Sequence, residues 1–215
     1  GAITGDENAN VLELGAQVKV NGSRSAYDYA TIDMGAGDDS LTMNDGVEVN
    51  GSIMMDRGDD TINMLGNVKV NTTVNQDSVA VDMGRGKDIL NVEGSGNAIA
   101  GTLALTQGEN TVNIKADSDL ALRDLETAGA DKTVFNIDGT LKIDAEALAF
   151  EAGETEIRIG ENGAITDSEG NTVAAISMKS ANANKLYNKG TLETDLEICL
   201  LYTSPSHETT LHLVC

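Results

Sequence analysis

A twelve-residue pattern, apolar-x-apolar-x-x-Gly-x-polar-x-apolar-x-apolar, recurs along this chain. The clear copies are centred on Gly37, Gly58, Gly86, Gly108 and Gly153, and weaker copies are centred on Asn8 and Asp131. Successive centres are 21 to 23 residues apart, except for two longer steps of 28 and 29 residues. A repeat of this length is typical of solenoids, in which each unit buries its apolar face only by stacking on the next one.

Apolar and polar residues alternate within each copy, which predicts β-strands with one buried face. A second alternating segment lies between the centres, as Val18/Val20, Val47/Val49, Val68/Val70, Leu120/Leu122 and Leu141/Ile143. Short runs of Gly, Asn and Asp between the segments supply turns, because these residues tolerate positive φ. The sequence therefore predicts an all-β fold, a parallel β-solenoid (β-helix) of roughly seven to nine coils, with about 22 residues per coil.

Parallel stacking of such coils, about 4.8 Å apart, predicts columns of equivalent residues. One interior column would hold Leu41, Ile62, Leu90 and Val112, the next Met43, Met64, Val92 and Ile114, and an outward polar ladder Thr42, Asn63, Asn91 and Asn113. An antiparallel sandwich also shows short alternating strands, but the fixed offsets around each centre favour the solenoid. We expect a regular solenoid over 1–160 and a less regular continuation over 161–198.

The end of the chain differs in composition from the rest. Every Pro, Cys and His lies after Ile198, at Cys199, Pro205, His207, His212 and Cys215. The run 199–206 resembles the conceptual translation of a transposase-type sequencing adaptor. We predict that 199–215 is a non-native tail, with a natural irregular tail as the alternative, and we exclude it from functional reasoning. Because the sequence starts at Gly1 inside a repeat, we also expect an internal segment of a longer protein.

Charge and composition exclude several classes of function. The formal net charge of −21 disfavours nucleic acid and anionic lipid as partners. No apolar run of 18 or more residues is present, so direct membrane insertion is not expected. No His precedes residue 199, and aromatic residues make up 3% of the chain. We therefore expect no enzyme activity, although polysaccharide-active enzymes built on β-helices are a rival interpretation.

Three segments, 34–42, 55–63 and 83–91, resemble the RTX nonapeptide Gly-Gly-x-Gly-x-Asp-x-apolar-x. In that family Ca²⁺ lies between successive turns, held by Asp carboxylates and backbone carbonyls. The resemblance implies a Ca²⁺ cofactor with Asp39, Asp60 and Asp88 as carboxylate ligands, and with Gly37, Gly58 and Gly86 forming the turn backbone. The motif departs from the family in occurring once per coil and in having Met at its first position. The alternative is a turn in which Asp caps local backbone amides.

The overall composition resembles that of exported bacterial β-solenoid repeat proteins, such as adhesins and autotransporter passengers. This resemblance implies an extracellular or bacterial cell-surface location and a structural or adhesive role. A surface ligand, glycan or protein, would be bound through the parent protein. The first alternative is an RTX-like calcium-binding module that folds when Ca²⁺ neutralises its Asp columns.

Overall fold

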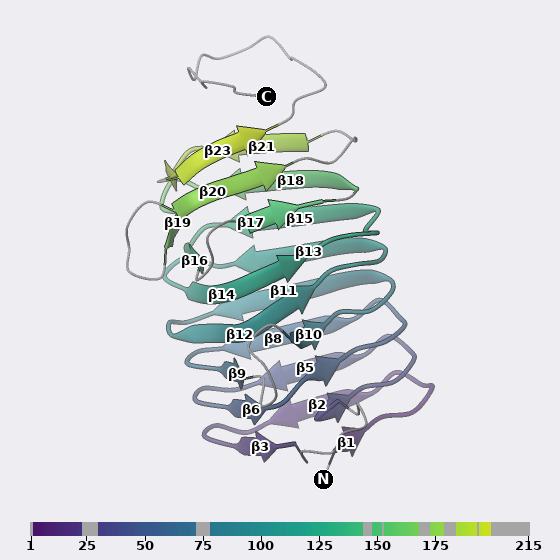
Figure 1. The fold of residues 1–215 in the computed structure, drawn as a ribbon. Coiled ribbons are helices and arrows are strands. Elements are labelled where there is room, and N and C mark those ends of the chain that lie inside the picture. Colours follow the sequence, from purple (N-terminus) through teal and green to yellow (C-terminus); the bar gives the residue numbers. More distant parts are fainter. Residues whose placement is uncertain are drawn as a thin grey trace.

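The computed structural model describes residues 2–22, 30–71, 78–143, 148–151, 153–167, 173–178, 184–192 and 194–198. These residues form short strands that stack layer upon layer along one axis (Figure 1). Each ladder between neighbouring strands is parallel, as in the pairing of β5 (Ser40–Met43) with β8 (Thr61–Leu65). The prediction of an all-β parallel solenoid is confirmed.

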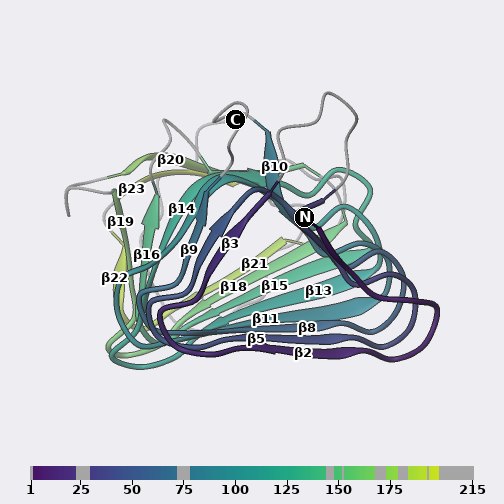
Figure 2. The ribbon, with the colours of Figure 1, turned by 90° about the horizontal axis from the view of Figure 1, so that it is seen from below.

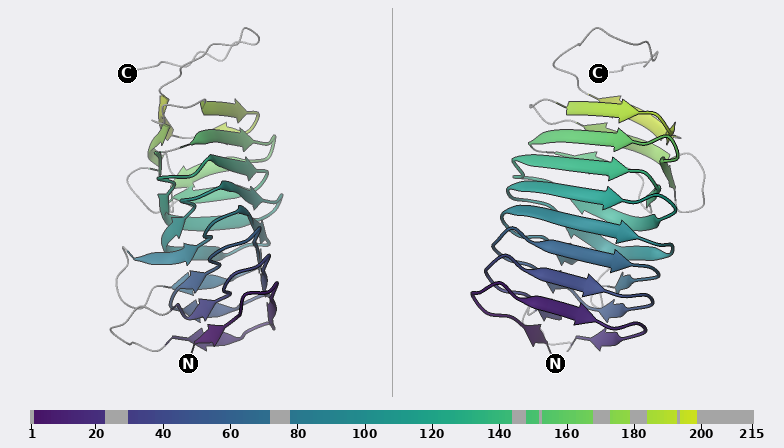
Figure 3. Two further views of the ribbon diagram at one scale, coloured as in Figure 1. Left: turned by 90° about the vertical axis from the view of Figure 1, so that its right-hand side faces the viewer. Right: turned by 180° about the vertical axis from the view of Figure 1, so that it is seen from behind.

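Three walls enclose a roughly triangular cross-section when the structure is viewed along its axis (Figure 2). One wall is an eight-stranded sheet that contains the segments after the Gly centres. Its strands, in order, are β2 (Val11–Leu14), β5, β8, β11 (Lys87–Glu93), β13 (Glu109–Ile114), β15 (Lys132–Ile137), β18 (Glu154–Ile159) and β21 (Asn184–Asn188). The view from behind shows this wall as an evenly stacked face (Figure 3, right).

The other two walls belong mainly to a twelve-stranded sheet that turns a corner within its long strands. Its main path is β1 (Ile3–Thr4), β4 (Ile32–Asp33), β7 (Ile53–Met54), β10 (Val79–Asp82), β12 (Asn97–Ala104), β14 (Asp119–Glu126), β16 (Thr140–Ile143), β19 (Ala164–Asp167) and β22 (Thr191–Leu192). The strands β3 (Lys19–Asn21), β6 (Glu48–Asn50) and β9 (Lys69–Asn71) join this path at β12. The register shifts between Ile99 and Thr102, where β12 passes from its pairing with β9 to its pairing with β10.

A three-stranded sheet continues the layers toward residue 198. It consists of β17 (Leu148–Phe150), β20 (Val173–Met178) and β23 (Thr194–Ile198), and β17 contacts β14. Strands β18 to β23 therefore repeat the three-wall order of the earlier layers. Residues 199–215, which include the predicted non-native tail, lie outside the described residues.

The interior columns have the predicted register. Leu41 pairs with Ile62, Ile62 with Leu90 and Leu90 with Val112, and all four side chains are at most 1% exposed. The same column continues to Phe135 in β15. The inward aliphatic side chains of all three walls form one continuous hydrophobic cluster. Since each layer covers the apolar surface of the next, the core extends along the whole stack.

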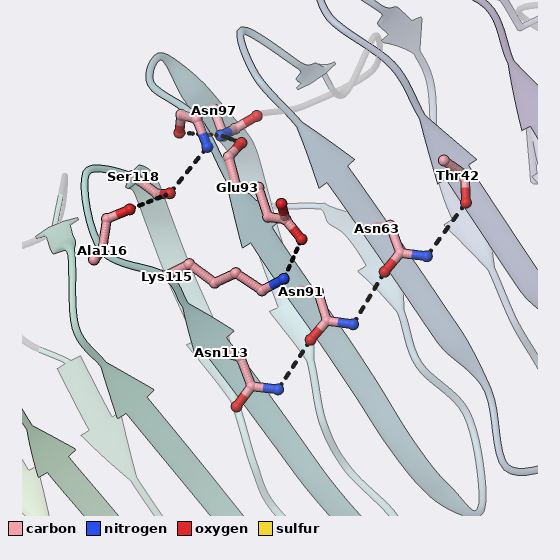
Figure 4. A network of polar contacts seen from close by, with 10 residues as sticks. Thr42, Asn63, Asn91, Glu93, Asn97, Asn113, Lys115, Ala116 and Ser118 are labelled. Atoms are coloured by element: carbon pink, nitrogen blue, oxygen red, sulfur yellow. Dashed lines mark hydrogen bonds and ion pairs between the residues drawn. The ribbon is translucent and has the colours of Figure 1, made fainter.

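An amide ladder runs along the outer face of the eight-stranded sheet (Figure 4). Each Asn Nδ2 donates to the equivalent residue of the preceding layer: Asn63 to Thr42 at 3.2 Å, Asn91 to Asn63 at 3.0 Å, Asn113 to Asn91 at 2.9 Å and Asn136 to Asn113 at 2.8 Å. Arg158 Nη1 ends the ladder on Asn136 Oδ1 at 3.1 Å. The predicted polar ladder is therefore present and is longer than expected.

Replacing Asn91 with alanine should lower the free energy of unfolding by about 1–2 kcal/mol, because one donor and one acceptor of the ladder are lost together. Asn91→Asp keeps an acceptor for Asn113, but at neutral pH its ionised carboxylate has no hydrogen to donate to Asn63, so its destabilising effect should be larger at neutral pH than at low pH, where the neutral carboxyl has a donor again. Urea unfolding followed by circular dichroism measures both changes. Equal stability of Asn91→Ala and the parent chain would show that the ladder contributes nothing.

Candidate functional site: a buried polar column

The three nonapeptide turns lead into the eight-stranded sheet through residues with positive φ. These are Gly35 (86°) and Gly37 (117°) in the first turn, Asp56 (68°) and Gly58 (145°) in the second, and Gly84 (80°) and Gly86 (150°) in the third. Asp56 occupies a position where the other two turns have Gly, and Asp is one of the few residues that tolerate this region. The three turns therefore share one backbone shape.

Hydrogen bonds between layers occupy the backbone of these turns. Gly37 N donates to Arg57 O at 2.7 Å, and Gly58 N donates to Arg85 O at 2.9 Å. The carbonyl of Gly86 accepts the amide of Glu109 at 2.8 Å. The turns thus stack through their own peptide groups, and these carbonyl oxygens already have a partner.

Asp39, Asp60 and Asp88 lie inside the solenoid. Their exposed fractions are 2%, 0% and 1%. Each precedes an inward aliphatic residue by two positions, as Asp39 precedes Leu41, so strand alternation places the carboxylate on the core side. This two-residue spacing between each Asp and an apolar residue is present in the sequence, and it could have predicted the burial of these side chains.

One oxygen of each carboxylate caps the layer before it. Asp39 Oδ1 accepts the amide of Asn10 at 2.6 Å, Asp60 Oδ1 accepts the amide of Asp39 at 2.8 Å, and Asp88 Oδ1 accepts the amide of Asp60 at 3.1 Å. Each Asp therefore satisfies a backbone donor, as in the capping alternative. The donor belongs to the equivalent residue of the neighbouring layer, not to the local turn.

The other oxygens of this column have no partner. Asp88 pairs in register with Asn110, Asn110 with Thr133, and Thr133 with Thr155. Within the described residues, the buried side-chain atoms that lack a hydrogen bond are Asp39 Oδ2, Asp60 Oδ2, Asp88 Oδ2, Asn110 Oδ1, Thr133 Oγ1 and Thr155 Oγ1. All six belong to this one column, which we call the polar column. Buried polar atoms without a partner are rare in proteins and call for an explanation.

Burial changes the ionisation of the column. It raises the pKa of Asp60 to about 6, with further increases from the neighbouring carboxylates of Asp39, Asp38 and Asp59. Burial likewise raises the pKa of Asp88 to about 7, and Asp60, Asp59 and Asp82 add to that shift. In both cases the hydrogen bond from the preceding amide opposes the shift without cancelling it.

A second row of charged residues follows the outside of the same edge. Asp38 Oδ1 accepts the amide of Asp59 at 2.9 Å, and Asp59 Oδ1 accepts the amide of Lys87 at 2.8 Å. From Lys87 onward the row alternates in sign, with ion pairs Lys87–Glu109 at 3.5 Å and Lys132–Glu154 at 3.4 Å. In the first layers, this edge of the eight-stranded sheet therefore carries carboxylates both on the core side and on the solvent side.

The polar column does not have the ligand set of a calcium site. Ca²⁺ requires six to eight oxygen ligands at about 2.3–2.6 Å, whereas each layer offers one unpartnered carboxylate oxygen. The carbonyls of Asp39 and Asp60 accept the amides of Thr61 and Ile89, and the three Asp side chains are at most 2% exposed. No group of three or more His, Cys, Asp or Glu side chains converges as metal ligands among the described residues. The calcium prediction therefore rests on the resemblance alone.

An open depression of about 280 Å³ lies at the corner between the eight-stranded and twelve-stranded sheets. Its lining consists of Asp117, Ser118, Asp119, Asp138, Gly139, Thr140, Lys142 and Asn162. Lys142 Nζ is 3.1 Å from Asp119 Oδ2, so its charge is paired. The depression is acidic, polar and solvent-facing.

Comparisons of the chain with models of protein families, with curated proteins and with solved structures find no match. In the part of the chain that the structure describes, no helix is long and apolar enough to cross a membrane.

Proposed function

We propose that this chain is a non-enzymatic shaft segment of a large secreted or cell-surface bacterial repeat protein, with a structural or adhesive role. The observation that carries the proposal is the uninterrupted hydrophobic cluster, to which all three walls contribute. A core that grows by addition of layers makes a rod whose length depends on the number of repeats. Such a rod can hold a binding region away from the surface to which it is anchored.

The outer surface suits exposure to solvent and to large ligands. Oppositely charged residues in adjacent layers pair, as in Lys19–Glu48 at 2.6 Å, and the net charge of −21 disfavours nucleic acids and anionic membranes. The amide ladder and the half-buried Ser40, Thr61 and Thr111 in the row beside it give the eight-stranded wall a largely polar face, interrupted by the exposed Ile89. A glycan or a protein, reached through the parent protein, is the class of ligand that such a face can meet.

Limited proteolysis and small-angle scattering of the full chain test the shaft role. The chain has 14 Lys and Arg residues, yet trypsin should leave the layered walls intact because cleavage requires local unfolding. Scattering should report an elongated particle. Rapid cleavage within the strands, or a spherical envelope, would contradict the proposal.

A panel of polysaccharides tests the non-enzymatic part of the proposal. Incubation with the chain should release no reducing ends and no unsaturated sugars, while immobilised glycans or host-surface proteins should retain it. Catalytic release of sugar that is lost on mutation of Asp119 and Lys142 would favour the enzyme interpretation instead.

A further inference from the structure

The polar column begins with three carboxylates in successive layers of the solenoid. Parallel layers are about 4.8 Å apart, and like charges at that spacing in a dry interior repel each other strongly. Each carboxylate has only one hydrogen-bond donor facing it, the amide of the preceding layer, apart from the extra contact from Asn10 Nδ2 to Asp39 Oδ1 at 3.1 Å. Three ionised groups would therefore leave three charged oxygens without compensation.

The charged groups around the column do not supply that compensation. The turns packed against it carry Asp38, Asp59 and Asp82, whose charges raise the pKa values of Asp60 and Asp88. The basic residues of these turns are Arg57, Arg85 and Lys87, and all three are exposed on the outside. Lys87 is also paired with Glu109. No cationic group among the described residues forms a hydrogen bond or an ion pair with the three buried carboxylates.

We propose that Asp60 and Asp88 form a proton-binding pair within the polar column, as neutral carboxyls in the folded protein at mildly acidic pH, so that acid stabilises the solenoid. A neutral carboxyl keeps Oδ1 as the acceptor for the preceding amide and gains a hydroxyl donor at Oδ2. Protonation therefore supplies hydrogen-bond donors at the buried Oδ2 atoms, which otherwise have no hydrogen-bond partner.

The next layers show which residue types occupy the equivalent position in the column. Asn110 takes the place of Asp88 one layer on, with nearly the same shape and no charge, and its Nδ2 donates to Gln107 O at 3.0 Å. Its Oδ1 lacks a donor and can accept one from a neutral Asp88. Thr133 and Thr155 follow, both neutral and both at 0% exposure. The column thus changes from ionisable to permanently neutral polar residues while its position in the core is kept.

The pKa values give the direction of the pH dependence. In the unfolded chain an Asp loses its proton near pH 4, whereas the folded pKa values are about 6 for Asp60 and about 7 for Asp88. Between about pH 4 and pH 7 the folded state therefore binds more protons than the unfolded state. The stability due to these groups is fully present below pH 4, falls as pH rises through this window, and is lost above it.

Thermal unfolding of the full chain between pH 4.5 and 8 tests this inference. The matched variants are Asp60→Asn/Asp88→Asn, which places in two layers the residue found at Asn110, and Asp45→Asn, which removes an exposed carboxylate in the turn between β5 and β6. The midpoint of the parent chain should fall by roughly 5 °C or more from pH 5 to pH 8. The double variant should lose most of that fall and be the more stable chain at pH 8, while Asp45→Asn should keep it.

Infrared spectroscopy gives a second readout that does not depend on stability. At pH 5.5 the parent chain should show a carboxylic acid C=O band that the double variant lacks. A parent midpoint that is flat or rises over this pH range would overturn the inference, as would an unchanged slope in the double variant. So would a Ca²⁺-dependent gain in midpoint at pH 8 that the double variant lacks, since calcium would then be the cation of the column.

Discussion

Replacing Gly58 with alanine is expected to lower the melting temperature by about 10 °C or more, corresponding to a loss of several kcal/mol. Gly58 has φ = 145°, a backbone conformation that residues with a Cβ rarely adopt. An added Cβ would also lie 1.9 Å from Gly37 O and 2.5 Å from Gly37 C in the adjacent layer. Because those atoms are backbone, relief requires the layers to separate, and the break would expose the core on both sides.

The control for this substitution is Gly15→Ala. A Cβ at Gly15 would have no atom within 4 Å, and Gly15 is not among the residues with positive φ. We expect a change of at most about 1 kcal/mol, with a small gain favoured because alanine restricts the unfolded chain. Scanning calorimetry of the two variants and the parent measures the difference. Similar midpoints for Gly58→Ala and Gly15→Ala would show that close stacking of the turns is not required.

The interior columns could be predicted from the sequence because two simple regularities determine them. Alternation assigns each residue to the inside or the outside, and the fixed offset from each Gly centre assigns it to a column. Leu41, Ile62, Leu90 and Val112 were aligned in this way, and their pairing in the structure has that register. The amide ladder followed from the same offsets, although its extension to Asn136 and Arg158 was missed.

The corner between two walls could not be predicted in the same way. At Ile99 and Thr102 the chain shifts register while remaining a strand, so apolar alternation is interrupted, and the single Gly101 is the only mark of the bend in the local sequence. The longer steps between centres include residues 23–29 and 72–77, which lie outside the described residues. The local sequence predicts a strand, but the direction in which that strand bends depends on its packing against the adjacent layers.

The sequence predicted which Asp residues form the candidate site, but their burial in the core was not predicted. The nonapeptide resemblance selected Asp39, Asp60 and Asp88 and implied that they hold Ca²⁺ between successive turns. The structure instead places these carboxylates in the core with one oxygen each on a backbone amide. Strand alternation could have predicted this location, because burial of Leu41, Ile62 and Leu90, each two positions after an Asp, fixes the side to which the Asp points.

Replacing Phe135 with alanine is the second substitution expected to have a large effect. Phe135 continues the column of Leu90 and Val112 and is 1% exposed, and its ring meets that of Phe150 edge to face, with centroids 5.4 Å apart and planes at 88°. Loss of this side chain should cost about 3–5 kcal/mol, from lost burial and from the cavity left behind. Denaturant unfolding at constant pH measures the change.

The aromatic pair can be separated from simple burial by a double-mutant cycle. Phe135→Leu and Phe150→Leu keep most of the apolar volume, so a coupling of about 0.5–1.5 kcal/mol between them would report the ring contact itself. Ile89→Ala is the control on the outer face of the same wall, since Ile89 is 38% exposed and its truncation should cost about 1 kcal/mol or less. A side chain packed between its equivalents in the two adjacent layers cannot be removed without leaving a cavity beside both of them. Phe135→Ala should therefore lower the free energy of unfolding more than Ile89→Ala does, and equal losses would show that the column is not a packed core.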